Sequence, residues 1–77
     1  MRDFSEFVTV EEDQLLFYFS RIYIAAGEEF FVSVKRSGKF YLFDLERDDS
    51  GKWKITKTAP AWLQTVEEEL ADIINQI

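Results

Sequence analysis

Residues 28–57 constrain the fold of this chain most, because they contain two turn sequences between runs of apolar, aromatic and β-branched residues. The first turn is Ser37-Gly38, where glycine can adopt a positive φ without steric cost, so a tight two-residue β-hairpin is predicted. Side chains alternate along a strand, and this turn sets three pairs on one face: Phe30 with Leu45, Val32 with Phe43, and Val34 with Tyr41. All six are apolar or aromatic, so we predict that this face packs in the core.

The second turn, at residues 48–52, predicts another hairpin. Aspartate and serine favour a type I turn, and Gly51 suits the left-handed position of a three-residue loop. This loop sets three further pairs: Leu45 with Ile55, Glu46 with Lys54, and Arg47 with Trp53. Trp53 and Ile55 thereby join the core face, and Glu46 with Lys54 is an exposed ion pair worth at most about 1 kcal/mol. Both turns and the hydrophobic pattern agree on one register, which favours this pairing.

The opposite face of these hairpins mixes aromatic, apolar and basic side chains. The residues that we predict to form an interaction face there are Phe31, Ser33, Lys35, Phe40, Leu42, Lys52 and Lys54. Aromatic rings between lysines are typical of proteins that bind single-stranded nucleic acid, since the rings stack on bases and the lysines contact phosphates. The alternative is a homodimer contact with the lysines as its solvated rim. We favour the dimer contact, because the net charge of −6 repels polyanions.

Length and composition indicate one small domain that spans residues 1–77. A chain of this length buries only about 60% of its unfolded surface, so its stability is limited. Eight Phe, three Tyr and two Trp indicate a compact aromatic core that self-association would extend. The longest apolar run, residues 15–19, is far shorter than the ~20 residues that cross a bilayer. The acidic N-terminus does not resemble a signal peptide, so we expect a cytoplasmic protein without a membrane partner.

The N-terminal part allows two interpretations. Residues 4–10 alternate as a strand does, and residues 11–14 form a polar break. Residues 9–26 also fit a helix, because Thr9 and Glu12 form a capping-box pattern and apolar residues recur at helical spacing afterwards. We favour a strand over residues 15–24, which are mainly β-branched and aromatic and carry apolar side chains on both faces. Ser20-Arg21 interrupts the apolar run and predicts a β-bulge.

The C-terminal part predicts an amphipathic helix that begins near Pro60, a residue suited to a first helical turn. Its apolar stripe consists of Trp62, Leu63, Val66, Leu70, Ile73, Ile74 and Ile77. Thr65 with Glu68 offers an alternative, later start. The predicted fold is therefore α+β: an antiparallel β-meander of four to five strands, with one C-terminal amphipathic helix packed on one face.

Catalysis has little support in the sequence. The chain contains no His and no Cys, so the commonest general base and the thiolate nucleophile are missing. Asp44, on the mixed face, could act as a functional acid, but we favour a carboxylate in water or bonded to Thr56 or a neighbouring lysine. No second carboxylate can be placed beside it from the sequence, so a paired acid–base site is not supported. Residues 67–69 are acidic but point in different directions on a helix. We predict a non-enzymatic protein without a cofactor or metal.

A β-meander followed by one amphipathic helix resembles, in the order of its elements, the repeat unit of the PUR family of single-strand nucleic-acid binders, which dimerise through such units. This resemblance implies a nucleic-acid partner and a dimer. From the residues themselves we expect an interaction module that self-associates as a homodimer or binds another protein. Single-stranded nucleic-acid binding by the same face is one alternative. A small acidic inhibitor or immunity-type protein is the other, suggested by the net charge.

Overall fold

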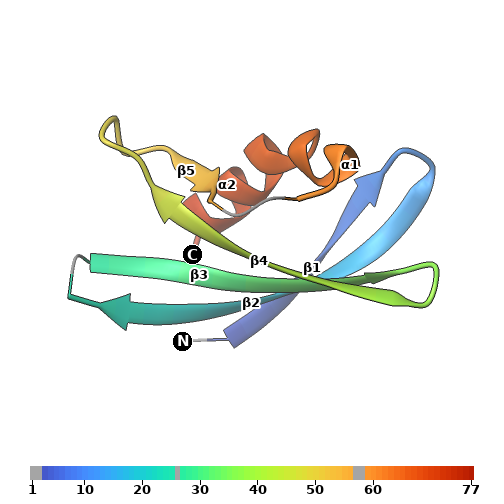
Figure 1. The fold of residues 1–77 in the computed structure, drawn as a ribbon, viewed down its shortest axis with the longest axis horizontal. Coiled ribbons are helices and arrows are strands. Elements are labelled where there is room, and N and C mark those ends of the chain that lie inside the picture. Colours follow the sequence, from blue (N-terminus) through green and yellow to red (C-terminus); the bar gives the residue numbers. More distant parts are fainter. Residues whose placement is uncertain (1–2, 26, 57–58) are drawn as a thin grey trace.

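The computed structural model describes residues 3–25, 27–56 and 59–77, and within these ranges the chain forms five strands followed by two short helices (Figure 1). The strands are β1 (Asp3–Val10), β2 (Asp13–Ile24), β3 (Gly27–Arg36), β4 (Lys39–Arg47) and β5 (Trp53–Ile55). The helices are α1 (Ala61–Gln64) and α2 (Glu67–Asn75). Neighbouring strands pair antiparallel in chain order, and both helices lie on the same side of the curled sheet. The predicted α+β class and antiparallel meander are confirmed.

The two predicted hairpins have the predicted register. Phe30 lies opposite Leu45 and Val32 opposite Phe43, while Arg47 lies opposite Trp53. At the first turn the φ angles are 53° for Ser37 and 78° for Gly38, the two positive values that a type I′ turn requires. In the second loop Gly51 has a φ of 86°, and the Asp48 backbone N–H donates to the Lys52 carbonyl at 2.8 Å. Local turn chemistry therefore sets the register of β3, β4 and β5.

The strand interpretation of residues 15–24 is confirmed, and the helical alternative for residues 9–26 is wrong; Ala26 itself lies outside the described residues. The predicted bulge at Ser20-Arg21 is wrong as well, because the ladder continues with Ser20 opposite Phe31 and Arg21 opposite Phe30. The Arg21 guanidinium lies 5.1 Å from the centre of the Phe30 ring. Arg21 Nε also lies 3.5 Å from Glu28 Oε2, so the arginine is accommodated on the inner face of the sheet without an extra residue.

The core lies between the inner face of the sheet, which is the face turned toward the helices, and the helices themselves. Its buried side chains from the sheet are Val8, Val10, Phe17, Phe19, Phe30, Val32, Val34, Phe43, Leu45 and Trp53. Those from the C-terminal segment are Leu63, Val66, Leu70 and Ile74. Alternate residues of the strands thus supply the core, as the period of two in a β-strand requires.

The single predicted helix is wrong, since the segment divides into α1 and α2 at Thr65-Val66. The Thr65 hydroxyl donates a 2.7 Å hydrogen bond to the Trp62 carbonyl, and Val66 has φ −107° and ψ 9°. Both residues are β-branched, and a threonine hydroxyl that bonds the preceding turn disfavours a regular helix. The break leaves Val66 buried beside Leu63 and Leu70.

Arg36 joins three segments that are far apart in the sequence. Its guanidinium Nη2 lies 2.6 Å from Glu11 Oε1 and 3.0 Å from Asp13 Oδ2, both at the turn between β1 and β2. The same guanidinium lies 4.7 Å from the centre of a ring of Trp62 in α1. The hydrogen bond to Glu11, followed by the bond to Asp13, raises the pKa of Arg36 above its ordinary value. These contacts tie the β1–β2 turn to β3 and to α1.

Candidate interaction face

The outer face of the sheet, turned away from α1 and α2, presents large side chains to solvent. Phe7 is 60% exposed, Tyr18 54%, Phe40 63% and Leu42 60%. They are outside because their strand neighbours on either side, such as Phe17 and Phe19 around Tyr18, fill the core. We call Phe7, Leu16, Tyr18, Phe40 and Leu42 the aromatic patch.

The cross-strand register makes this patch continuous across four strands. Phe7 on β1 lies opposite Leu16 on β2. Tyr18 lies opposite Ser33, which in turn lies opposite Leu42. The small side chain of Ser33 therefore occupies a low point between two large ones, and the patch extends from the first to the fourth strand.

The predicted interaction residues divide into two groups. The outer face brings together Phe31, Ser33, Lys35, Phe40 and Leu42, with the Lys35 ammonium 5.5 Å from the centre of the Phe40 ring. Phe31 is half-buried, so its ring is less accessible for stacking on a ligand than a fully exposed ring would be. Lys52 and Lys54 line a cleft between β5 and α2, away from the aromatic patch.

The contacts of Lys54 show why Lys52 and Lys54 lie apart from the other predicted interaction residues. It is opposite Glu46, as predicted, but its ammonium lies 3.7 Å from Glu67 on α2. The predicted exposed pair with Glu46 is therefore replaced by a contact that crosses the sheet edge to the helix. The lysine rim expected around the patch is reduced to Lys35 on β3.

Phe7, Leu16 and Tyr18 are part of the patch that sequence reasoning did not assign to it. The alternation in β1 and β2 was recognisable, but the turn between these strands, residues 11–12, has no glycine that would specify its register. In the structure Glu11 adopts a φ of 57°, a left-handed conformation uncommon for glutamate. Without that turn geometry, the register of β1 against β2 could not be derived from the sequence.

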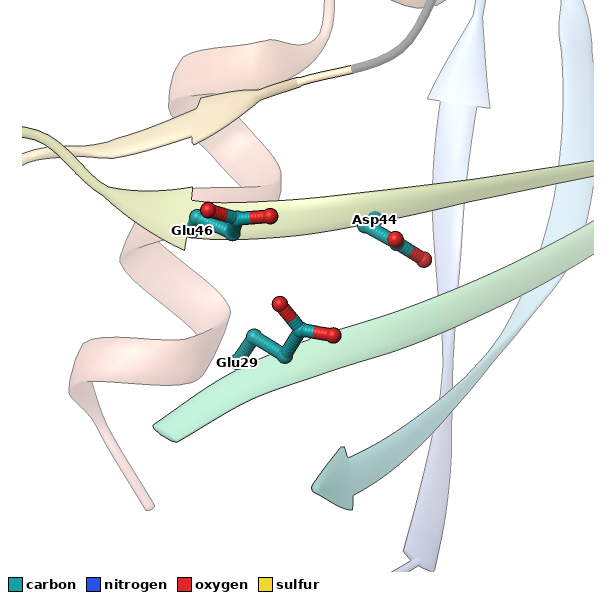
Figure 2. Close-up of side chains that lie close together, drawn as sticks. All are labelled: Glu29, Asp44 and Glu46. Carbon is teal, nitrogen blue, oxygen red and sulfur yellow. The ribbon is translucent and has the colours of Figure 1, made fainter. Parts of the chain in front are cut away.

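Three carboxylates meet on the outer face at the other end of β3 and β4 (Figure 2). One oxygen from each of Glu29, Asp44 and Glu46 lies within 4.8 Å of the other two. Glu29 is directly opposite Glu46, and Asp44, which is only 8% exposed, lies on the same face as Glu46. We call these three residues the carboxylate cluster. Oxygen ligands of this kind suit hard cations such as Ca²⁺ or Mg²⁺, with water completing the coordination.

The sequence alone did not place a second carboxylate beside Asp44, whereas the structure brings both Glu29 and Glu46 close to it. Extending the predicted hairpin by one pair beyond Phe30 and Leu45 places Glu29 opposite Glu46, next to Asp44. The signal was thus present in the register. The β3–β4 pairing was followed only as far as Phe30 and Leu45, so the next pair, Glu29 with Glu46, was missed.

The cleft between β5 and α2 has a volume of about 390 Å³. The Trp53 indole N–H donates to the Asn75 side-chain oxygen at 3.2 Å, and the Ile55 backbone N–H donates to Glu67 at 2.8 Å. Both hydrogen bonds hold α2 against β5. The polar groups of this cleft therefore have a structural role, and the aromatic patch is the stronger candidate for recognition.

No family model, no curated protein and no solved structure matches this chain. Within the ranges that the structure describes, none of the helices has the length and apolar character needed to cross a membrane. The function therefore has to be inferred from the outer face itself.

Proposed function

We propose that this protein is a non-enzymatic interaction module of the cytoplasm that forms a homodimer through its outer face. The observation that carries this proposal is the aromatic patch, in which Phe7, Tyr18, Phe40 and Leu42 are each more than half exposed. We take α1 and α2 to pack as amphipathic helices over the inner face, so that the outer face is the one left for a partner.

The size of the patch supports a protein contact. With side chains of roughly 200 Å² each, these exposures leave about 450 Å² of apolar and aromatic surface, a size at which such patches often mark contact sites. A stable interface takes about 800 Å² from each partner. The patch would supply about half of that area, and the polar residues around it would supply the rim.

Single-stranded nucleic acid is the second candidate for the same face. It is favoured by the Lys35 ammonium above the Phe40 ring, a pairing of charge and stacking surface that such binders use. The carboxylate cluster on the same face opposes it, because three negative side chains repel a phosphate backbone. Half-burial of Phe31 also removes one of the expected stacking rings. A protein surface is therefore the better partner.

Analytical ultracentrifugation of the wild-type protein from low to high micromolar concentration tests the dimer. We expect the sedimentation coefficient to rise with concentration, and a strict monomer would contradict the proposal. Phe40→Glu should give a folded monomer, because the new carboxylate lies opposite Lys35 and cannot be buried at an apolar interface. Tyr23→Lys is the matched control: Tyr23 is 68% exposed, lies opposite Glu28 and is outside the patch, so its dimer should be unchanged.

Fluorescence titration with single-stranded oligonucleotides over a series of salt concentrations tests the second candidate. The dimer proposal predicts no binding that weakens with salt. Tight, salt-dependent binding that Phe40→Glu abolishes would favour nucleic acid instead.

A further inference from the structure

We propose that the inner face of the sheet carries a binding site for a phosphate monoester, built from Arg21 and Arg47 at the end where β2 turns into β3. These two arginines share a single carboxylate, that of Glu28. The site uses none of the side chains of the aromatic patch, so it is independent of the proposed dimer.

Arg36 shows how the inner face accommodates an arginine with a full set of partners. Its side chain is 17% exposed, and its Nη2 lies 2.6 Å from Glu11 Oε1 and 3.0 Å from Asp13 Oδ2. Two carboxylates therefore compensate one guanidinium. Arg36 ends β3 at the β3–β4 turn, which lies at the opposite end of the sheet from the β2–β3 turn (Figure 1).

Arg21 is almost as buried as Arg36 but has fewer partners. Its side chain is 22% exposed, and its buried Nε donates no hydrogen bond to any residue that the structure describes. Its Nε lies 3.5 Å from Glu28 Oε2, an ion pair too long for a good hydrogen bond. A buried N–H group without an acceptor is rare in proteins and often marks a site for another molecule.

Glu28 cannot compensate Arg21 alone, because its other oxygen, Oε1, accepts a 3.4 Å hydrogen bond from Arg47. One carboxylate thus faces two guanidinium groups, the reverse of the ratio at Arg36. One positive charge of this group stays uncompensated, and both arginines keep N–H donors that Glu28 does not engage.

Two rings of the core hold these guanidinium groups in place. That of Arg21 lies 5.1 Å from the centre of the Phe30 ring, and that of Arg47 lies 4.8 Å from the centre of a ring of Trp53. The two rings meet edge to face, with their centres 5.3 Å apart. The arginines therefore lie over adjoining rings, and a ligand that binds both has little side-chain motion to restrict.

A phosphate group suits this pair of arginines better than a carboxylate does. A carboxylate has two oxygens, and one guanidinium can occupy both of them. A phosphate monoester has three acceptor oxygens and nearly two negative charges at neutral pH. It can therefore bind Arg21 and Arg47 together and compensate the charge that Glu28 leaves.

Tyr23 favours a monoester over free phosphate. It lies two residues beyond Arg21 on β2, hence on the same face, and it is directly opposite Glu28. Its ring is exposed, so it can pack against an aromatic group that carries the phosphate.

The direction of approach follows from the charges around Arg47. A cleft of about 330 Å³ beside this arginine is also lined by Ile24, Gly27, Glu28 and Glu46. Glu46 belongs to the outer face, and its negative charge opposes a phosphate on that side of the cleft. The ligand therefore approaches from the inner face, over Arg21 and Tyr23.

Titration with phenyl phosphate and with inorganic phosphate at constant ionic strength tests the site, followed by NMR of the arginine Nε–H groups. Phenyl phosphate should bind with a dissociation constant of about 1 mM, as a few charge-assisted hydrogen bonds allow. It should shift the signals of Arg21 and Arg47 and leave that of Arg36 in place. Inorganic phosphate should bind about two- to tenfold more weakly, and Tyr23→Ser should remove this difference.

Substitutions at the site and away from it complete the experiment. Arg21→Met and Arg47→Met should each weaken binding about tenfold or more, while methionine keeps an apolar side chain over the ring. Glu28→Gln should tighten binding about tenfold, because it removes the charge that competes with the phosphate. Arg36→Met is the matched control and should bind as the wild type does, since Arg36 already faces two carboxylates.

Equal affinity of the wild type, Arg21→Met and Arg47→Met would overturn the site. So would shifts of the Arg36 signal as large as those of Arg21, which would indicate non-specific binding to arginine. If Arg21→Met does not fold, the exposed Arg47 and Glu28→Gln decide, and unchanged affinity in both Arg47→Met and Glu28→Gln would overturn the site. Equal affinity for the two probes would overturn the role of Tyr23.

Discussion

The backbone N–H of Ile55 donates a 2.8 Å hydrogen bond to the Glu67 side chain. Ile55 ends β5, a strand of only three residues at the edge of the sheet, and Glu67 begins α2. An edge strand presents unpaired N–H groups that can recruit other chains. The Glu67 carboxylate satisfies one of these groups, and it also lies 3.7 Å from the Lys54 ammonium. This one side chain therefore anchors the helix and covers the sheet edge.

Glu67→Ala should lower the free energy of unfolding by about 1–2 kcal/mol, because the partly buried Ile55 N–H loses its acceptor. Glu67→Gln is the matched control, since it removes the charge that attracts Lys54 but keeps an oxygen acceptor. We expect the glutamine variant to lose less than half as much stability in urea unfolding. Equal losses for the two variants would assign the effect to the ion pair with Lys54.

Leu70→Ala and Leu42→Ala compare the same substitution on the two sides of the sheet. Leu70 is fully buried, so its truncation should cost about 2–5 kcal/mol. Such a loss is comparable with the whole stability of a domain of this size, and circular dichroism should show a largely unfolded chain. Leu42 is 60% exposed, so its truncation should change the stability of the dilute monomer by less than about 0.5 kcal/mol. A larger loss of stability for Leu42→Ala than for Leu70→Ala would mean that the outer face, and not the inner face, is the one packed in the core.

Asp48 should make the stability of the second hairpin depend on pH. Its Oδ1 accepts hydrogen bonds from the Ser50 hydroxyl at 2.6 Å and from the backbone N–H groups of Ser50 and Lys52. The Ser50 hydroxyl, followed by the Lys52 backbone N–H, holds the pKa of Asp48 below its ordinary value. The folded chain thus binds this proton less readily than the unfolded chain. The stabilisation is complete above the unfolded pKa of about 4 and is lost as the pH falls through the lower folded pKa.

Asp48→Asn provides the control for this prediction. It retains an oxygen acceptor for Ser50 and Lys52 but does not titrate, so its unfolding free energy should fall less steeply in acid than that of the wild type. Urea unfolding at several pH values below about 5 measures the two slopes. If the unfolding free energies of the two proteins fell with the same slope in acid, Asp48 would not be a source of the pH dependence.

Arg36→Met should loosen the β1–β2 turn, because it removes the two contacts with Glu11 and Asp13 while keeping an aliphatic stem beside Trp62. Hydrogen exchange should show faster exchange at the ends of β1 and β2, with the centre of β3 unchanged. Arg36→Lys keeps the charge but lacks the planar fork, so it should have an intermediate effect. Uniformly faster exchange throughout the sheet would indicate global destabilisation instead.

The hairpins of β3, β4 and β5 were predictable because their determinants are local. Ser37-Gly38 and the loop ending at Gly51 specify turn types, and a turn type with alternating apolar residues leaves one register. The break between α1 and α2 was not predictable to the same degree. The apolar stripe from Leu63 to Ile74 fits a continuous helix, and only burial of Val66 at the break, together with the Thr65 hydrogen bond, shows where it divides.

The candidate site was predictable in part for the same reason. Phe40 and Leu42 were assigned to the outer face from the hairpin register alone, whereas Phe7 and Tyr18 were not, since their strands join β3 through pairings that no local sequence specifies. Asp44 was identified as a notable carboxylate, but its neighbours Glu29 and Glu46 come from two strands.

The sequence by itself determined the antiparallel meander and the parity that separates core from outer face, because turn geometry and side-chain alternation act over a few residues. Tertiary structure decided how far the sheet curls, where the terminal helix breaks, and which side chains from β1 and β2 complete the aromatic patch. These features depend on contacts such as that between Arg36 and Glu11, which are 25 residues apart. Contacts of that range are set by the packing of the whole core, to which each local segment contributes only a part.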